Sequence, residues 1–208
     1  MCDRVLTTIL LDAMGVLYRA GDDVAELLVP FIQERNPDVP VADIEASYLM
    51  ASLGQLTAAD FWKHFGLDPS VEDEYLKEHR LQDGVLDFLC WAQNKSLSVS
   101  CLSNDVSEWS QKLRRWFGLE EKIQHWIISG DVHVRKPKAE IYQCFLQRSG
   151  MTAATVLFVD DRIKNVDAAR AKGFEAVLFG TDQTAYETHT PMCTSFRDLQ
   201  SYCKAFLQ

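Results

Sequence analysis

Short apolar runs recur along the second half of the chain, and segments with helical periodicity separate them. The strand-like runs are residues 98–102, 126–128, 156–159 and 176–179, with an earlier one at 9–11. The helix-like segments are residues 106–117, 139–147 and 165–172, and each ends near a glycine. Such alternation needs right-handed crossovers and a parallel sheet covered on both faces. The pattern predicts an α/β fold with a doubly wound, Rossmann-like core.

Residues 18–82 have a different pattern, which is helical throughout. Breaks at Pro30, residues 36–37, Pro40, Gly54 and residues 66–69 leave four helical stretches at 22–32, 42–51, 57–65 and 71–79. Thr57 and Asp60 form a variant of the capping box at the start of the third stretch. We predict a small all-helical insertion at 18–82 that lies over the carboxyl ends of the strands, and a core made of residues 1–17 and 83–208.

The length and charge of the chain argue against nucleic-acid and membrane partners. The chain has 208 residues, enough for one core domain with a modest insertion, and its net charge is −9 with no basic run. An acidic chain of this kind is a poor ligand for nucleic acid. The apolar runs are short, no export signal is evident, and the six cysteines lack a paired spacing. We expect a cytoplasmic protein without membrane or nucleic-acid partners, whose oligomeric state the sequence does not reveal.

Polar side chains stand at or near the ends of four apolar runs. They are Asp12, the pair Ser103 and Asn104, Lys136 within Arg-Lys-Pro, and the pair Asp160 and Asp161. Ligands of an open parallel sheet bind outside the carboxyl ends of its strands, so we expect these groups to meet in one cleft. Each group alone has an ordinary explanation as a turn or cap residue. The acid pair is the hardest to explain in that way, because adjacent buried carboxylates repel each other unless a cation is present.

The four motifs, in this order between residues 7 and 181, resemble those of the haloacid dehalogenase superfamily, in its phosphatase branch with a small helical cap. Residues 54–62 are also similar to a stretch found in such caps. The resemblance implies hydrolysis of a phosphorylated small molecule, with Asp12 as the nucleophile that forms an aspartyl-phosphate and Lys136 as a neighbouring cation.

The same resemblance implies roles for the other motif residues. Ser103, Asn104 and Lys136 would bind phosphate. Asp12, Asp161 and the backbone carbonyl of Met14 would bind Mg²⁺, an ion that prefers oxygen ligands. Asp160 would orient Lys136, and Asn165 would support the acid pair without contacting the metal or the substrate itself.

Met14 is the position at which the chain departs from the family. Position 14 should share a face with Asp12 on an extended strand, and in the phosphatases it is an aspartate that protonates the leaving oxygen and then activates water. A thioether does neither. Hydrolysis of alkyl phosphates should therefore be weak unless another group serves, and candidates in the insertion are Glu45, Tyr48, His64 and His79.

Several functions therefore remain open. The first is a Mg²⁺-dependent phosphatase-like hydrolase, and the second is a non-catalytic regulatory protein that keeps the metal and phosphate site. The third is hydrolysis at a carbon–halogen bond, since the dehalogenases also replace this aspartate, although they lack the acid pair. A phosphonate hydrolase would use Lys63 as a Schiff-base lysine. The intact pair of Asp160 and Asp161 favours phosphate chemistry.

Overall fold

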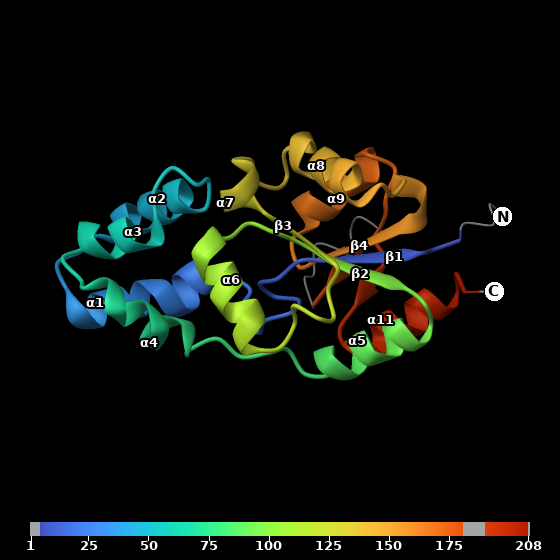
Figure 1. The fold of residues 1–208 in the computed structure, drawn as a ribbon, viewed down its shortest axis with the longest axis horizontal. Coiled ribbons are helices and arrows are strands. Elements are labelled where there is room, and N and C mark those ends of the chain that lie inside the picture. Colours follow the sequence, from blue (N-terminus) through green and yellow to red (C-terminus); the bar gives the residue numbers. More distant parts are fainter. Residues whose placement is uncertain (1–4, 181–189, 208) are drawn as a thin grey trace.

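The computed structural model describes residues 5–180 and 190–207, and its centre is one parallel sheet (Figure 1). The strands are β1 (Thr8–Leu11), β2 (Ser98–Ser103), β3 (His125–Ile128), β4 (Val156–Asp160), β5 (Glu175–Phe179) and β6 (Met192–Cys193). Their order is β3-β2-β1-β4-β5-β6, and every neighbouring pair is parallel. This order is the doubly wound arrangement, which confirms the predicted fold class.

Helices cover both faces of the sheet, as a parallel sheet requires. On one face Leu10, Phe158 and Leu178 pack against α8 (Ala139–Ser149) and α9 (Ile163–Ala171). On the other face their neighbours, such as Ile9 and Val159, pack with residues of α5 (Val85–Asn94), α6 (Ser107–Trp116) and α11 (Phe196–Lys204). Figure 1 shows α8 and α9 on the side opposite to α5 and α11. Successive side chains along each strand thus point to opposite faces of the sheet and pack in two separate hydrophobic cores.

The helices between β1 and β2 make up the predicted insertion. They are η1 (Val24–Leu28), α1 (Val29–Arg35), α2 (Val41–Ala51), α3 (Ala58–His64), η2 (Pro69–Val71) and α4 (Glu72–Leu76). The capping-box interpretation of α3 is half correct: Asp60 N–H donates to Thr57 Oγ1 at 3.1 Å, but the Asp60 carboxylate accepts from the Thr57 hydroxyl. Among the described residues, the insertion has strand-type pairing only in two isolated bridges of Tyr18, one with Met14 and one with Leu81. The division at residues 18 and 82 stays a prediction.

Two details of the predicted helices were wrong. Pro30 does not interrupt the first helix, because it lies in the first turn of α1, where a missing N–H is tolerated, directly after the π-helical turn η1. The fourth helix ends at Leu76 rather than His79, and the following residues form turns such as Glu78 N–H to Tyr75 O at 3.0 Å.

The insertion is joined to the core where α2 ends. Ser129 Oγ, in α7 (Ser129–Val132), donates to Ser52 O at 2.5 Å. A nitrogen of the His133 ring lies 2.9 Å from Leu53 O. Gly54 has a φ of +68°, and a Cβ there would overlap Gly130 O, so this close approach requires glycine. Among residues 5–180 and 190–207, no helix has the length and apolar character needed to cross a bilayer.

Candidate active site

A cavity of about 290 Å³ lies between the carboxyl ends of the central strands and the helical insertion. Six residues of the predicted motifs line it, namely Asp12, Met14, Ser103, Asn104, Lys136 and Asn165. Its volume is at the small end of the range for sites that bind small molecules. The segments that supply these residues are far apart in the sequence, and the sheet topology brings them together.

Asp12 stands at the carboxyl end of β1, where its backbone N–H still bonds to Val159 O at 2.9 Å. This pairing holds its carboxyl group at the edge of the sheet, where the residue is 6 % exposed. Oδ1 accepts from Ala13 N–H at 2.6 Å and from Lys136 Nζ at 2.7 Å. Burial raises the pKa of Asp12 well above its usual range, and the Lys136 ammonium opposes that rise. An ionised Asp12 therefore depends on positive charge nearby.

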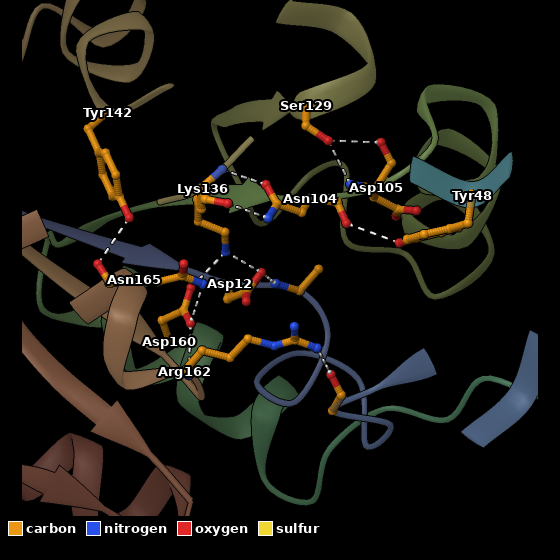
Figure 2. Close-up of polar contacts among 12 residues, drawn as sticks. Asp12, Tyr48, Asn104, Asp105, Ser129, Lys136, Tyr142, Asp160, Arg162 and Asn165 are labelled. Atoms are coloured by element: carbon orange, nitrogen blue, oxygen red, sulfur yellow. Dashed lines mark hydrogen bonds and ion pairs between the residues drawn. The ribbon is translucent and has the colours of Figure 1, made fainter. Parts of the chain in front are cut away.

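Lys136 bridges two carboxyl groups, as Figure 2 shows. Its buried Nζ lies 2.7 Å from both Asp12 Oδ1 and Asp160 Oδ2. Burial alone would lower the pKa of Lys136, but the two carboxylates raise it above its ordinary value, so the side chain is an ammonium. Asn104 fixes the main chain of Lys136: Lys136 N–H donates to Oδ1 at 2.8 Å, and Nδ2 donates to Lys136 O at 3.0 Å. The Asn104 amide thus positions Lys136, and its contact with phosphate stays a prediction.

Asp160 is fully buried and its hydrogen-bond partners fix its orientation. Oδ1 accepts from Arg162 N–H and from Asn165 Nδ2, both at 2.9 Å, while Oδ2 faces Lys136. Tyr142 OH in turn donates to Asn165 O at 3.0 Å. The structure therefore brings Asp160 and Asn165 into the arrangement expected for orienting Lys136 (Figure 2).

Three carboxyl groups are close enough to hold one cation. Ligand oxygens of Asp12, Asp160 and Asp161 all lie within 4.8 Å of one another. Asp161 Oδ1 is buried and has no hydrogen-bond partner in the described part of the chain. Burial and the neighbouring Asp160 raise the pKa of Asp161 to about 6. A Cβ at Gly15, whose φ is +76°, would overlap the Asp161 carboxylate, so glycine is needed there.

This all-oxygen set with an unsatisfied atom fits a hard divalent cation such as Mg²⁺. The group includes two of the predicted ligands and adds Asp160, whose oxygens are already engaged by Lys136, Arg162 and Asn165. The ligand role of the Met14 carbonyl stays a prediction.

Ser103 ends β2 and is 1 % exposed. Its Oγ has no hydrogen-bond partner among the residues that the structure describes. A buried hydroxyl without a partner calls for an explanation. A ligand oxygen in the cavity that Ser103 lines would provide one.

Met14 lines the same cavity as Asp12, but the predicted reason was wrong. β1 ends at Leu11, and Met14 lies in a turn with a bridge to Tyr18 rather than on an extended strand. The turn, which passes through Gly15 at positive φ, carries the thioether to the cavity wall.

The residues suggested as substitutes for the missing acid fall into two groups. Glu45 and Tyr48 line the cavity, and Tyr48 OH donates to Asn104 O at 3.1 Å. His64 is exposed and His79 is buried against the rings of Tyr18 and Tyr75, and neither lines the cavity. Lys63 is also exposed, and its Nζ lies 3.5 Å from Asp60 Oδ1.

Five charged residues on the cavity wall were missed, namely Asp22, Asp23, Arg135, Arg162 and Lys164. Arg135 and Arg162 directly adjoin Lys136 and the acid pair, so their position next to a motif was a usable signal. Arg162 Nη2 donates to Gly21 O at 3.1 Å, which links the acid pair to the first residues of the insertion. Asp23 carried no signal, because nothing in the sequence shows that it is buried.

Comparison with known proteins identifies related hydrolases. A family model for haloacid dehalogenase-like hydrolases matches residues 6–173. A phosphoglycolate phosphatase from Pseudomonas savastanoi pv. phaseolicola is 23% identical over 192 residues, which are 81% of this chain and 67% of that protein. A second such phosphatase, from Nitrosococcus oceani, is 27% identical over 50% of this chain and 47% of its own length, so this chain spans about half of that relative.

Two kinds of enzyme share the fold among solved structures. A HAD phosphatase from Thermococcus onnurineus has a TM-score of 0.72 and 17% identity, covering 95% of this chain and 97% of its own. An L-2-haloacid dehalogenase from Xanthobacter autotrophicus has a TM-score of 0.68 and 19% identity, covering 96% and 99%. At these identities the likeness concerns the fold alone.

Proposed function

Because the chain belongs to the haloacid dehalogenase-like hydrolase family, we propose that it is a Mg²⁺-dependent hydrolase of a phosphorylated small molecule. One observation carries the proposal: Lys136 Nζ contacts both Asp12 and Asp160, beside the unpartnered oxygen of Asp161. A carboxylate and an ammonium on the wall of one small cavity, with a metal-binding acid close to that carboxylate, are the groups that phosphoryl transfer to an aspartate needs.

In the proposed reaction an Asp12 oxygen attacks phosphorus while the bond to the leaving oxygen breaks and its electron pair stays on that oxygen. Lys136 offsets the charge of the phosphoryl group, and Ser103 Oγ donates a hydrogen bond to one of its oxygens. Water then attacks the phosphorus of the aspartyl-phosphate, which releases phosphate and restores the Asp12 carboxylate. Asp160 and Asn104 hold Lys136 in place through the contacts described above.

Mg²⁺ would be held by Asp12, Asp161 and the carbonyl of Met14. When bound, it supplies the positive charge that lets a carboxylate approach an anionic phosphoryl group. The protein side of this site is compatible with the ion, since Asp161 Oδ1 has no hydrogen-bond partner in residues 5–180 and 190–207 and Gly15 leaves room beside it.

Carbon–halogen hydrolysis and phosphonate hydrolysis have less support. The shared fold does not select the dehalogenase chemistry, because a phosphatase has that fold as well. The acid pair favours a metal and a phosphate. For phosphonates, the exposed Lys63 is paired with Asp60 and does not line the cavity.

A non-catalytic binding protein is the second candidate, and Met14 is the observation that favours it. A protein of this kind would keep the metal and phosphate groups but would lack the usual proton donor. Binding without turnover would distinguish it from the hydrolase.

The first prediction tests the nucleophile. Asp12→Asn removes the attacking carboxylate, so phosphate release from p-nitrophenyl phosphate or 2-phosphoglycolate with Mg²⁺ should fall to the background rate. The circular dichroism spectrum should stay unchanged, which shows that the fold is intact. Asp167→Asn, an exposed acid on α9, is the matched control and should keep wild-type turnover. Equal turnover in wild type and Asp12→Asn would contradict the proposal, whereas phosphate binding without turnover in wild type would favour the binding protein.

A further inference from the structure

The cavity contains a carboxyl group that the proposed reaction has not yet used. Asp22, Asp23 and Glu45 of the insertion line it together with Asp12 and Met14. Asp22 and Glu45 are exposed, whereas Asp23 is 5 % exposed. Asp23 is therefore the insertion carboxyl that combines cavity lining with burial.

The ordinary structural role for an aspartate at this position does not apply to Asp23. It directly precedes η1, where aspartate commonly caps the helix by accepting from a backbone N–H. Its side chain makes no such hydrogen bond. Its Oδ2 is buried and has no hydrogen-bond partner among residues 5–180 and 190–207. A buried and unsatisfied carboxyl group destabilises the protein, so its presence suggests a role in function.

The surroundings of Asp23 shift its pKa towards neutral pH, where a carboxyl group can both donate and accept a proton. Burial, with a contribution from Asp22, raises its pKa to about 7, against the lowering effect of Arg162 and Arg135. The other titratable groups that interact with it are Tyr48, Tyr75 and Asp105. Proton transfer near neutral pH is most effective from a group with such a pKa.

Arg162 relates Asp23 to the proposed nucleophile. Its positive charge lowers the pKa of Asp23. Burial alone would lower the pKa of Arg162, but the carboxylates of Asp161, Asp22 and Asp12 raise it. Arg162 is thus within electrostatic range of both carboxyl groups, and all three residues border the same cavity.

We propose that Asp23 is the catalytic acid and base that takes over the task lost at Met14; this inference rests on the proposed phosphatase function. The protonated Asp23 gives its proton to the leaving oxygen, directly or through one water, as the Asp12–phosphorus bond forms and the phosphorus–oxygen bond breaks. The alcohol departs. The Asp23 carboxylate then takes a proton from the water that attacks the aspartyl-phosphate, so phosphate leaves and both carboxyl groups return to their starting state.

Substrates with different leaving groups test this role. Asp23→Asn should lower the rate of alcohol release from glycerol 2-phosphate in a single turnover about 10²–10⁴-fold, because an alkoxide leaves poorly without a proton. The fall in single-turnover release of p-nitrophenol from p-nitrophenyl phosphate, a leaving group that needs no proton, should be less than about 10-fold. For glycerol 2-phosphate the wild-type kcat should decline as the pH rises through about 7, and the variant should lose that decline. Asp167→Asn, which changes an exposed carboxylate on α9 away from the cavity, is the matched control.

A second substitution distinguishes a catalytic role from a structural one. Met14→Asp should restore kcat for glycerol 2-phosphate in the Asp23→Asn background, and the rescue should exceed the gain that Met14→Asp gives in wild type. Equal losses in the single-turnover release of the two leaving groups, or an additive pair of substitutions, would overturn the role of Asp23. An inactive wild type that stays inactive after Met14→Asp would instead overturn the proposed function itself. The Mg²⁺ affinity of Asp23→Asn should equal that of wild type, which would show that neither of these outcomes results from loss of the metal site.

Discussion

At the scale of single residues, the site combines polar groups that follow the strands with a carboxyl group, that of Asp23, whose properties depend on its burial. Asp12, Lys136 and Asp160 were recognisable because each stands in a short motif near the end of an apolar run. Asp23 was not, since its exposure and its missing cap hydrogen bond are properties of the folded chain. The position of Met14 was anticipated, but by way of a strand that in fact stops at Leu11.

Met14→Asp tests whether the cavity otherwise keeps phosphatase geometry. The substitution places a carboxyl group on the cavity wall that Met14 now occupies, so turnover of an alkyl phosphate should rise, with a ceiling of about 10²–10⁴-fold. The gain for p-nitrophenyl phosphate should be smaller. A further acid near Asp12 carries a like-charge cost, so the variant should need more Mg²⁺. Steady-state kinetics at saturating Mg²⁺ measure this, with Met14→Asn as the neutral control; no gain would favour the binding protein.

Asp23 also predicts how stability depends on pH. Its pKa in the folded protein, about 7, is above the ordinary value of 3.8. The folded state therefore binds this proton more tightly than the unfolded state, and the resulting stabilisation is complete below about pH 4 and is lost as the pH rises through 7. Asp23→Asn stays neutral, so between pH 4 and pH 8.5 it should gain up to about 4 kcal/mol in unfolding free energy relative to wild type.

Urea unfolding without Mg²⁺ at several pH values measures this difference. Asp167→Asn, which changes an exposed carboxylate on α9, should follow the wild-type pH dependence. Parallel curves for wild type and Asp23→Asn would show that the Asp23 carboxyl group is not desolvated in solution.

At the scale of elements, the buried strands were the easiest to predict. The bounds of four strands, β1, β2, β4 and β5, differ by at most one residue at each end from those of the predicted apolar runs. Strands that are buried on both faces have nearly continuous hydrophobic sequences, which makes them easy to recognise. The helix α5 was missed even though Val85, Phe88, Leu89 and Ala92 have helical spacing and are buried. β6 has two residues and carries no periodic signal; its pairing with β5 depends on the finished sheet.

Glu72 is predicted to hold the insertion helices to core helix α6. Its Oε2 accepts from Trp62 Nε1 at 3.1 Å and Trp109 Nε1 at 2.9 Å, and Oε1 lies 2.7 Å from Lys112 Nζ. Glu72→Ala leaves two buried indole N–H groups without this acceptor, so the unfolding free energy should fall by about 2–4 kcal/mol. Asp73→Asn breaks only the exposed contact of Asp73 with Lys112 and should cost about 0.5 kcal/mol or less. Equal costs in urea unfolding would show that the indole contacts do not stabilise the fold.

At the scale of the whole molecule, the fold brings the acidic groups of the site together although their burial and mutual repulsion oppose folding. The doubly wound order places β1 between β2 and β4, so Asp12 and the acid pair meet at one edge. The insertion and the ends of the strands then enclose that edge in one cavity. Bringing three carboxyl groups together opposes folding, since burial raises the pKa of both Asp12 and Asp161. The family assignment was within reach of the sequence, but this electrostatic cost became visible only in the folded chain.

That cost leads to a prediction about metal and stability. A cation that binds the folded but not the unfolded chain stabilises it by about 2.7 kcal/mol at 100 times its Kd. For a chain of this size, 1 kcal/mol shifts Tm by about 2–4 °C, so saturating Mg²⁺ should raise Tm by about 5–11 °C. Asp161→Asn removes a ligand and a repelling charge, so at pH 8 its Tm without metal should exceed that of wild type while the Mg²⁺ response disappears. Calorimetry should likewise detect no Mg²⁺ binding to Asp161→Ala, whereas Asp167→Asn on α9 should respond as wild type does. A full Mg²⁺ response in both Asp161 variants would place the ion elsewhere, because the remaining carboxyl oxygens of Asp160 are engaged by Lys136, Arg162 and Asn165.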